Sequence, residues 1–159
     1  MSEDTEELSP DELAIWIHLT GVVMTLPAAV DAQLKRGSGV NFFEYMIMMR
    51  LSREAGRAMQ LCGLAQVAFG SPSRLSHAIS RLEKQGWVER RSAGRGMHSV
   101  EAVLTEAGAA KLAEATPGHV REIRRLVFDV LTPAQLAGLK DIAARILDVT
   151  TPDAASRTC

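Results

Sequence analysis

The sequence predicts a mainly α-helical fold: a winged helix-turn-helix with a two-stranded β-hairpin wing, flanked by helices at both ends. Three observations predict it. Hydrophobic residues make up 47% of the 159 residues but aromatic residues only 4%, a composition that favours helices over a sheet-rich fold. Several segments begin with an oxygen-bearing residue followed by proline, a helix-start signal. Near residues 87–104 the pattern changes to short Val-rich segments separated by glycines, which indicates a hairpin.

The N-terminal part is expected to contain two helices. The first begins at Ser9-Pro10-Asp11-Glu12, which combines a serine cap, proline at the first helical position and glutamate at the third. It would extend to Arg36 with a kink at Pro27, because proline lacks the N–H that a helix interior needs. The second begins at Asn41 and ends near Arg53.

Residues 13–30 carry no charged side chain, and these 18 residues are close to the minimum for crossing a membrane. The stretch nevertheless contains His18, Thr20 and Thr25, and helix-capping residues precede it. We therefore expect a helix that is buried in a core or in an interface between two copies, and no membrane span.

The middle of the chain predicts a helix-turn-helix and a wing. A short helix near residues 61–68 leads to a turn at Gly70, and Ser71-Pro72 then caps a helix that runs to Gln85. Residues 87–91 and 100–104 indicate the two strands of the hairpin. Because the second helix of such a pair enters the major groove, residues 41–104 predict a DNA-binding region.

The helix at 72–85 has two unlike faces. At about 100° per residue, Leu75, Ala78, Ile79 and Leu82 fall within an arc of about 80°, which predicts the face that packs on the domain. The opposite arc is polar, cationic and nearly free of carboxylates: Ser73, Arg74, His77, Ser80, Arg81 and Lys84. Arginine can donate two hydrogen bonds to guanine, so this face is the predicted reader of DNA bases.

Charge is distributed unevenly along the chain. The net charge is −1, but residues 71–98 hold six cations and two anions, a local +4, and the remaining 12 cations and 17 anions give −5. A basic segment on an acidic chain is typical of a protein that binds a polyanion. The predicted DNA contacts are Ser71, Ser73, Arg74, His77, Arg81, Lys84, Arg90, Arg91 and Arg95, the last three in the wing. The alternative, an ordinary solvated surface, applies most to Lys84 and Arg91.

Two further helices are expected after the hairpin. Thr105 caps a fifth helix that would be perturbed at Pro117-Gly118. Thr132-Pro133 begins a sixth, with an apolar face made by Leu136, Leu139, Ile142, Ala143 and Ile146.

Other classes of site find little support. Cys62 and Cys159 are too few for a disulfide scaffold or a zinc cluster, which favours a reducing cytoplasm, and the acidic N-terminus argues against a signal peptide. The four histidines show no ligand spacing, so we expect neither a metal nor a cofactor. Glycine-rich phosphate loops, His-Glu-x-x-His and nucleophile-elbow motifs are absent from the sequence, so we do not expect an enzyme.

Seven short motifs occur in order along the chain: Phe42-Phe43-Glu44-Tyr45, Met48-Met49-Arg50-Leu51-Ser52, Leu64-Ala65, Ser71-Pro72-Ser73-Arg74-Leu75-Ser76-His77, Arg81-Leu82-Glu83-Lys84, Gly86-Trp87-Val88-Glu89-Arg90-Arg91 and Val103-Leu104-Thr105-Glu106-Ala107-Gly108. Their order and spacing resemble the MarR family of bacterial transcriptional regulators over residues 13–149. The resemblance implies one domain, residues 1–159, that forms a homodimer on a pseudo-palindrome in double-stranded DNA. Residues 9–36 and 105–149 would be the dimerisation helices. Two departures are Ala93, where the family commonly has aspartate, and a longer loop between Arg95 and Leu104.

The resemblance also implies a repressor that a small aromatic or anionic effector releases from DNA. Residues that could line an effector cleft are Trp16, His18, Leu19, Phe42, Tyr45 and Met46; the alternative is that they are core and interface packing. Some members of the family sense oxidants, which makes Cys62 a candidate thiol, although buried packing is the simpler interpretation. A third alternative is a winged helix that binds protein, but the outward face of residues 72–85 would then be apolar or acidic instead of cationic.

Overall fold

The computed structural model describes residues 7–67, 70–92 and 100–151, and every structural statement below refers to these residues. The helices are α1 (Pro10–Ser38), α2 (Phe42–Ser52), α3 (Leu61–Val67), α4 (Pro72–Lys84), α5 (Glu106–Ile123) and α6 (Pro133–Thr150). A 3-10 turn, η1 (Ala55–Arg57), follows α2, and a π turn, η2 (Arg124–Phe128), follows α5. The strands are β1 (Ala58–Gln60), β2 (Val88–Ser92) and β3 (Val100–Leu104). The predicted fold class, mainly α with a winged helix-turn-helix, is confirmed.

The predicted helix starts are confirmed by their capping hydrogen bonds. Ser9, Asn41 and Thr132 each form a reciprocal capping box with the residue three positions later. Ser71 and Thr105 each accept a backbone N–H of the following helix. These bonds satisfy N–H groups that the first turn of a helix leaves without partners, so the local sequence fixes where each element begins.

The sheet has three strands, not the two that the sequence predicted. β3 lies between β1 and β2 and is antiparallel to both, with Val103 opposite Ala58 and Leu104 opposite Val88. The sequence reasoning missed β1 because three residues are too few for an alternating pattern to be visible. The strand follows Gly56 and Arg57, which adopt φ values of 65° and 54°. This left-handed pair redirects the chain from η1 into the sheet.

The path of α5 also differs from the expectation, because the helix continues through Pro117 without interruption. Proline at this position removes a hydrogen bond to the carbonyl of Ala113. Ala113 and Pro117 both line an open cleft of about 390 Å³. The regular pattern changes later, in η2, where the helix widens to a π turn before α6.

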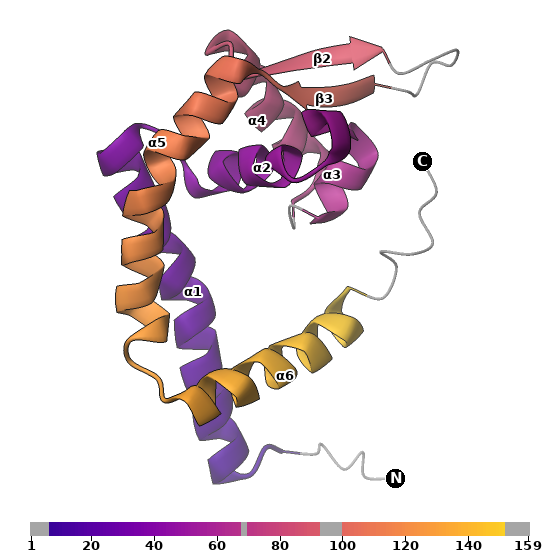
Figure 1. Ribbon diagram of the computed structural model, residues 1–159. Helices are drawn as coiled ribbons and strands as arrows, with labels where there is room; N and C mark the ends of the chain where they lie inside the picture. Colours follow the sequence, from indigo (N-terminus) through magenta and orange to yellow (C-terminus); the bar gives the residue numbers. More distant parts are fainter. Residues whose placement is uncertain (1–6, 68–69, 93–99, 152–159) are drawn as a thin grey trace, which may run out of the picture.

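The core lies where α2, α4, the sheet and the C-terminal half of α1 meet (Figure 1). Its completely enclosed side chains include Leu34, Ile47, Leu51, Leu64 and Ile79. α1 and α5 lie side by side and carry this region at one end. The predicted inner face of α4 is confirmed, because Leu75, Ala78, Ile79 and Leu82 are all buried.

Large apolar side chains are exposed on the helices outside the winged helix-turn-helix, α1, α5 and α6, which we call the outer helices. On the N-terminal half of α1 they include Ile15, Trp16, Val23 and Met24, and none of the described residues of α6 is buried. α6 projects away from the rest of the chain (Figure 1). α1 is also long and apolar enough to cross a membrane, with a mean hydropathy of 1.8 over its most apolar window. These surfaces are uncovered in one copy of the chain.

Candidate nucleic-acid interface

The recognition helix predicted at residues 72–85 corresponds to α4, which ends one residue earlier. The hydroxyl of Ser71 accepts the N–H of Arg74 at 3.2 Å, and Pro72 occupies the first helical position. The polar face is turned to solvent, and its exposed residues are Ser73, Arg74, His77, Arg81 and Lys84, with Ser80 half-buried. The first turn contains no acidic residue, so the positive end of the helix dipole is uncompensated there. Such a helix start suits a backbone phosphate.

The guanidinium of Arg74 packs over an aromatic ring from another helix. The central carbon of its guanidinium lies 4.3 Å from the ring centroid of Phe43, in the first turn of α2. At this distance the cation is attracted to the negative face of the ring. Sequence reasoning did not predict this contact, since the two residues are 31 positions apart.

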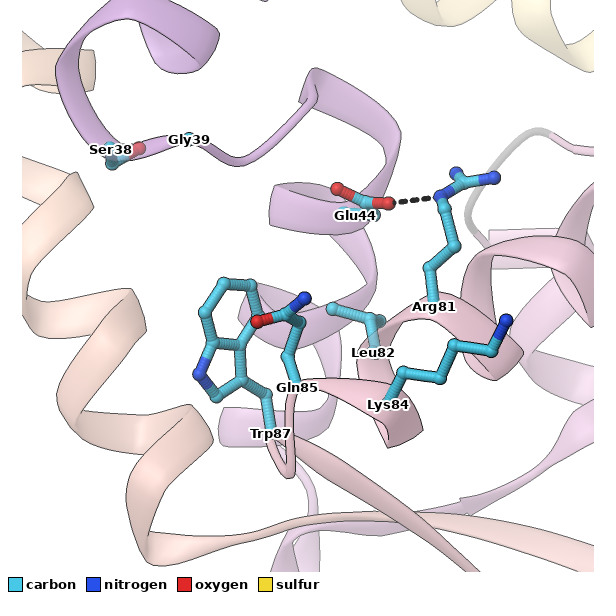
Figure 2. Close-up of a pocket in the computed structure, with 8 residues that line it drawn as sticks. All are labelled: Ser38, Gly39, Glu44, Arg81, Leu82, Lys84, Gln85 and Trp87. Atoms are coloured by element: carbon cyan, nitrogen blue, oxygen red, sulfur yellow. Dashed lines mark hydrogen bonds and ion pairs between the residues drawn. The ribbon is translucent and has the colours of Figure 1, made fainter.

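Arg81 is held by a buried carboxylate. Its Nε donates to Oε1 of Glu44 at 2.6 Å (Figure 2). The Arg81 side chain is 54% exposed and that of Glu44 only 10%. The bond uses one of the five N–H groups of the guanidinium, and the terminal nitrogens point away from Glu44 in Figure 2. Lys84 lies on the next turn of α4, and together with Glu44 and Arg81 it lines a cleft of about 410 Å³.

Arg90 directs its described hydrogen bonds to α4. It forms an ion pair with Glu83, and its backbone N–H donates to the same carboxylate at 3.1 Å. Its other terminal nitrogen donates to the carbonyl of Ser76 at 3.3 Å and to the hydroxyl of Ser80 at 3.2 Å. Arg90 therefore fastens β2 to α4, a role that sequence reasoning did not foresee when it placed this residue among the DNA contacts.

Arg91 lies directly opposite Glu101 in the antiparallel pair of β2 and β3, and its Nε donates to Oε1 of Glu101 at 2.6 Å. Its side chain remains 56% exposed. Opposite charges at directly paired positions stabilise an antiparallel pair of strands. The predicted wing contact Arg95, together with Ala93 and the long loop, lies outside the described residues.

The six proposed effector residues divide into two groups. Trp16, His18 and Leu19 are exposed on the N-terminal half of α1. Tyr45 is buried on α2, where Phe42 and Met46 are half-buried. Asp31 marks where α1 contacts the start of α2, because its carboxylate accepts the N–H of Phe42. Leu19 lies 12 positions before Asp31, or about 18 Å along the helix. One copy of the chain does not bring the two groups together.

Near the second group, His119 of α5 is buried beside aromatic rings. Its ring centroid lies 4.3 Å from that of Tyr45 and 6.1 Å from that of Phe42. Burial lowers the pKa of His119 below its ordinary value, because the charged form loses solvation. The hydroxyl of Tyr45 is 3.2 Å from that of Thr116, on the same helix as His119.

A cleft of about 470 Å³ lies between α1, α2 and α4. Three cationic residues line it, Lys35, Arg74 and Arg81, together with Asp31 and Phe42. Of the six proposed effector residues, only Phe42 lines this cleft. Among the described residues no group of three or more His, Cys, Asp and Glu side chains could hold a metal ion.

Cys62 is exposed near the start of α3, which corrects the expectation of a buried cysteine. Gly63 and Leu64 follow it, and of these three residues only Leu64 turns into the core. Cys62 is not a free thiol in the structure. A redox role for this residue stays a hypothesis.

Comparison with known proteins gives several relatives, although no protein-family model matches the chain. Sco3205, a MarR family transcriptional regulator from Streptomyces coelicolor in complex with DNA, is 32% identical, with a TM-score of 0.90 over 98% of this chain and 97% of that one. AbsC, a MarR family transcriptional regulator from the same organism, is also 32% identical, with a TM-score of 0.81 over 89% and 98% of the two chains. The transcriptional repressor MprA of Escherichia coli (strain K12) is 24% identical over 115 residues, or 72% of this chain. That match covers 65% of MprA, less than two thirds of its length.

Proposed function

The chain belongs to the MarR family and is a DNA-binding transcriptional regulator, and from this premise we propose that it represses transcription as a homodimer on a pseudo-palindromic operator. One observation carries the proposal: α4 buries its apolar face and presents Arg74, His77, Arg81 and Lys84 to solvent. A relative with 32% identity over nearly the whole chain is known in complex with DNA. We expect the protein to act in the cytoplasm, by binding and not by catalysis.

Arg74 and Arg81 are the residues that we assign to base reading. They are seven positions apart, so both lie on the same side of α4, about 10 Å from each other along the axis. Each guanidinium retains terminal N–H groups that could donate to O6 and N7 of a guanine. The N-terminal residues Ser71 and Ser73 are assigned to a backbone phosphate, because the free N–H groups of α4 begin there.

The homodimer is proposed from the uncovered apolar surface. Trp16 and Val23 on α1, and Ile142 and Val149 on α6, are each more than half exposed in one copy. A second copy could cover both helices at once, whereas a membrane would have to accommodate α6 with its four charged residues, Lys140, Asp141, Arg145 and Asp148. The partner that fits this surface is therefore another chain of the same kind.

The assignment of the reading helix is tested with DNA selected from a random duplex library by the wild-type protein. Arg74→Ala is expected to weaken binding to the selected duplex by about tenfold or more, since a good arginine–guanine pair contributes 1–3 kcal/mol. The dimer should be unchanged, measured by sedimentation. As a control, Arg145→Ala removes an exposed cation of α6 that pairs with Asp141. Equal affinity of the wild-type protein, Arg74→Ala and Arg81→Ala for the selected duplex would show that α4 does not read DNA.

We also propose that a small aromatic anion regulates DNA binding through the cleft between α1, α2 and α4. The observation that favours it is the set of Lys35, Arg74 and Arg81 around this cleft, beside the ring of Phe42. An anion bound there would occupy two of the arginines that we assign to DNA. Benzoate is a suitable probe: titration calorimetry should detect binding, and millimolar benzoate should release the selected duplex. If the wild-type protein neither binds benzoate nor releases the duplex, this part of the proposal is wrong.

A further inference from the structure

The first turn of α2 contacts both arginines of the outer face of α4. Phe43 and Glu44 are consecutive residues, and they contact Arg74 and Arg81, which are two turns apart on α4. We propose that Phe43 and Glu44 are positioning residues for DNA reading: they fix the side-chain conformations of Arg74 and Arg81 before DNA binds. This inference rests on the proposed function, in which α4 enters the major groove.

The part of α2 that holds the arginines is itself firmly fixed. Glu44 donates its backbone N–H to the side chain of Asn41 at 2.8 Å, and Oε2 of Glu44 accepts the N–H of Asn41 at 3.1 Å. A carboxylate oxygen of Asp31, on α1, accepts the N–H of Phe42 at 2.9 Å. Three of the backbone N–H groups at this helix end are therefore bonded to side chains. A carboxylate or ring placed on this turn has little freedom to move.

Each oxygen of the Glu44 carboxylate has its own partner. Oε2 completes the capping box with Asn41, and Oε1 accepts Nε of Arg81. A carboxylate that is 10% exposed needs such partners, because an unpaired buried charge is costly. The same side chain thus closes the start of α2 and holds an arginine of α4.

The ring of Phe43 is equally restricted. Its residue is 7% exposed, and the tip of the ring lies against Gly70 in the turn before α4. A Cβ on Gly70 would overlap the ring, so glycine at this position leaves the space that the ring occupies. Phe43 therefore presents a fixed surface to the Arg74 guanidinium.

Fixing these side chains in advance favours binding. An arginine has four rotatable bonds, and ordering it upon contact with DNA opposes association. Contacts already present in the free protein reduce that cost. The orientation of the Arg81 guanidinium is also suitable, because Glu44 accepts only its Nε–H and the terminal nitrogens point away from Glu44 (Figure 2). Those nitrogens are the ones that can bond O6 and N7 of guanine together.

The experiment replaces Glu44 by glutamine and measures binding to the duplex that wild-type protein selects from a random library. Glutamine still completes a capping box, but it carries no charge for Arg81. We expect Glu44→Gln to bind the selected duplex about five- to tenfold more weakly. In a repeated selection, base preference should relax at the positions where Arg81→Ala also relaxes it. Glu12→Gln is the matched control, since Glu12 has the same capping-box position on α1.

A double-mutant cycle separates positioning from simple stabilisation of the fold. If Glu44 acts through Arg81, Glu44→Gln causes no further loss of affinity in the Arg81→Ala background. An equal loss in both backgrounds, or a loss that follows the melting temperature with unchanged base preference, would overturn the proposal. If Arg74→Ala and Arg81→Ala both leave affinity unchanged, the assignment of the reading helix fails instead.

Phe43→Leu tests the second contact without a change of charge. Leucine keeps an apolar side chain in the core but removes the aromatic face under Arg74. We expect about threefold weaker binding to the same duplex, and no further loss when Arg74 is already alanine. Equal weakening with and without Arg74 would contradict the role of Phe43.

Discussion

The region that we propose to read DNA (the reading region, residues 41–104) and the outer helices α1, α5 and α6 differ in how much apolar surface each covers by itself. In α4, Leu75, Ala78, Ile79 and Leu82 are at most 3% exposed in a single chain. In α6, Ile142 is 55% exposed and Val149 74%. The reading region therefore covers its apolar side chains within a single chain, whereas the outer helices leave many of theirs exposed. In the proposed homodimer, folding and assembly would therefore be divided between the two parts of the chain.

The two regions also differ in whether their ion pairs join separate elements or lie within one helix. In the reading region several of them join separate elements: Glu44 with Arg81 links α2 to α4, and Glu101 with Arg91 links β3 to β2. In α5 and α6 the pairs Glu122 with Arg125 and Asp141 with Arg145 lie within one helix segment, three or four positions apart. Pairs of that kind at the surface contribute little to stability, because water screens them. The ion pairs named for the reading region therefore connect separate elements, and Arg57 with Glu106 connects that region to α5.

The largest effect is expected from a charge on the apolar face of α6. In Ile142→Lys each copy of a dimer would bury an unpaired ammonium group, which costs several kcal/mol, so the dimer Kd should rise by at least about 100-fold. Sedimentation should show a monomer, and affinity for the selected duplex should fall with it. The matched control is Ala144→Lys on the opposite face of the same helix. A dimer that persists in Ile142→Lys would show that this face is not the interface.

A smaller effect is expected from the wing. Arg91→Ala should reduce the dependence of log K on log salt by about one for each copy, with little change in base preference, because one phosphate contact is lost. Glu101→Gln is the companion variant: it releases Arg91 from its ion pair but keeps the cation, so the salt dependence should not decrease. A loss of base preference in Arg91→Ala would instead make the wing a reader of bases.

The smallest effect concerns the junction of the two regions, at His119. Burial lowers the pKa of His119 in the folded protein below its ordinary 6.5, so the unfolded chain binds the proton more readily. The stability linked to His119 is complete above pH 6.5 and is lost as the pH falls toward the lower folded pKa. His119→Leu should therefore lose less stability than wild-type protein between pH 7.5 and pH 5.5, measured by urea unfolding. The same loss in both proteins would contradict this assignment.

Sequence reasoning predicted the helix starts and both faces of α4, because caps and apolar periodicity are local signals. Ser71 and the inner face of α4 are examples. It could not predict the acidic partners of the arginines, since Glu44 and Arg81 are 37 residues apart and meet only after α2 and α4 pack. Glu44 was visible as the third residue of a capping box, but its second role needs the tertiary structure. For the same reason, a count of charges over residues 71–98 overstates the free positive charge of this surface.

The hydrogen bonds of Arg90 have a consequence for the layout of the operator. By bonding to Glu83, Ser76 and Ser80, Arg90 holds β2 in a fixed position on α4. The stretch of duplex that one copy would cover is then expected to have a constant length. In the proposed homodimer, the spacer between the two half-sites would depend instead on how the outer helices of the two copies meet. We therefore expect natural target sites to vary in that spacer and to keep each half-site unchanged in length.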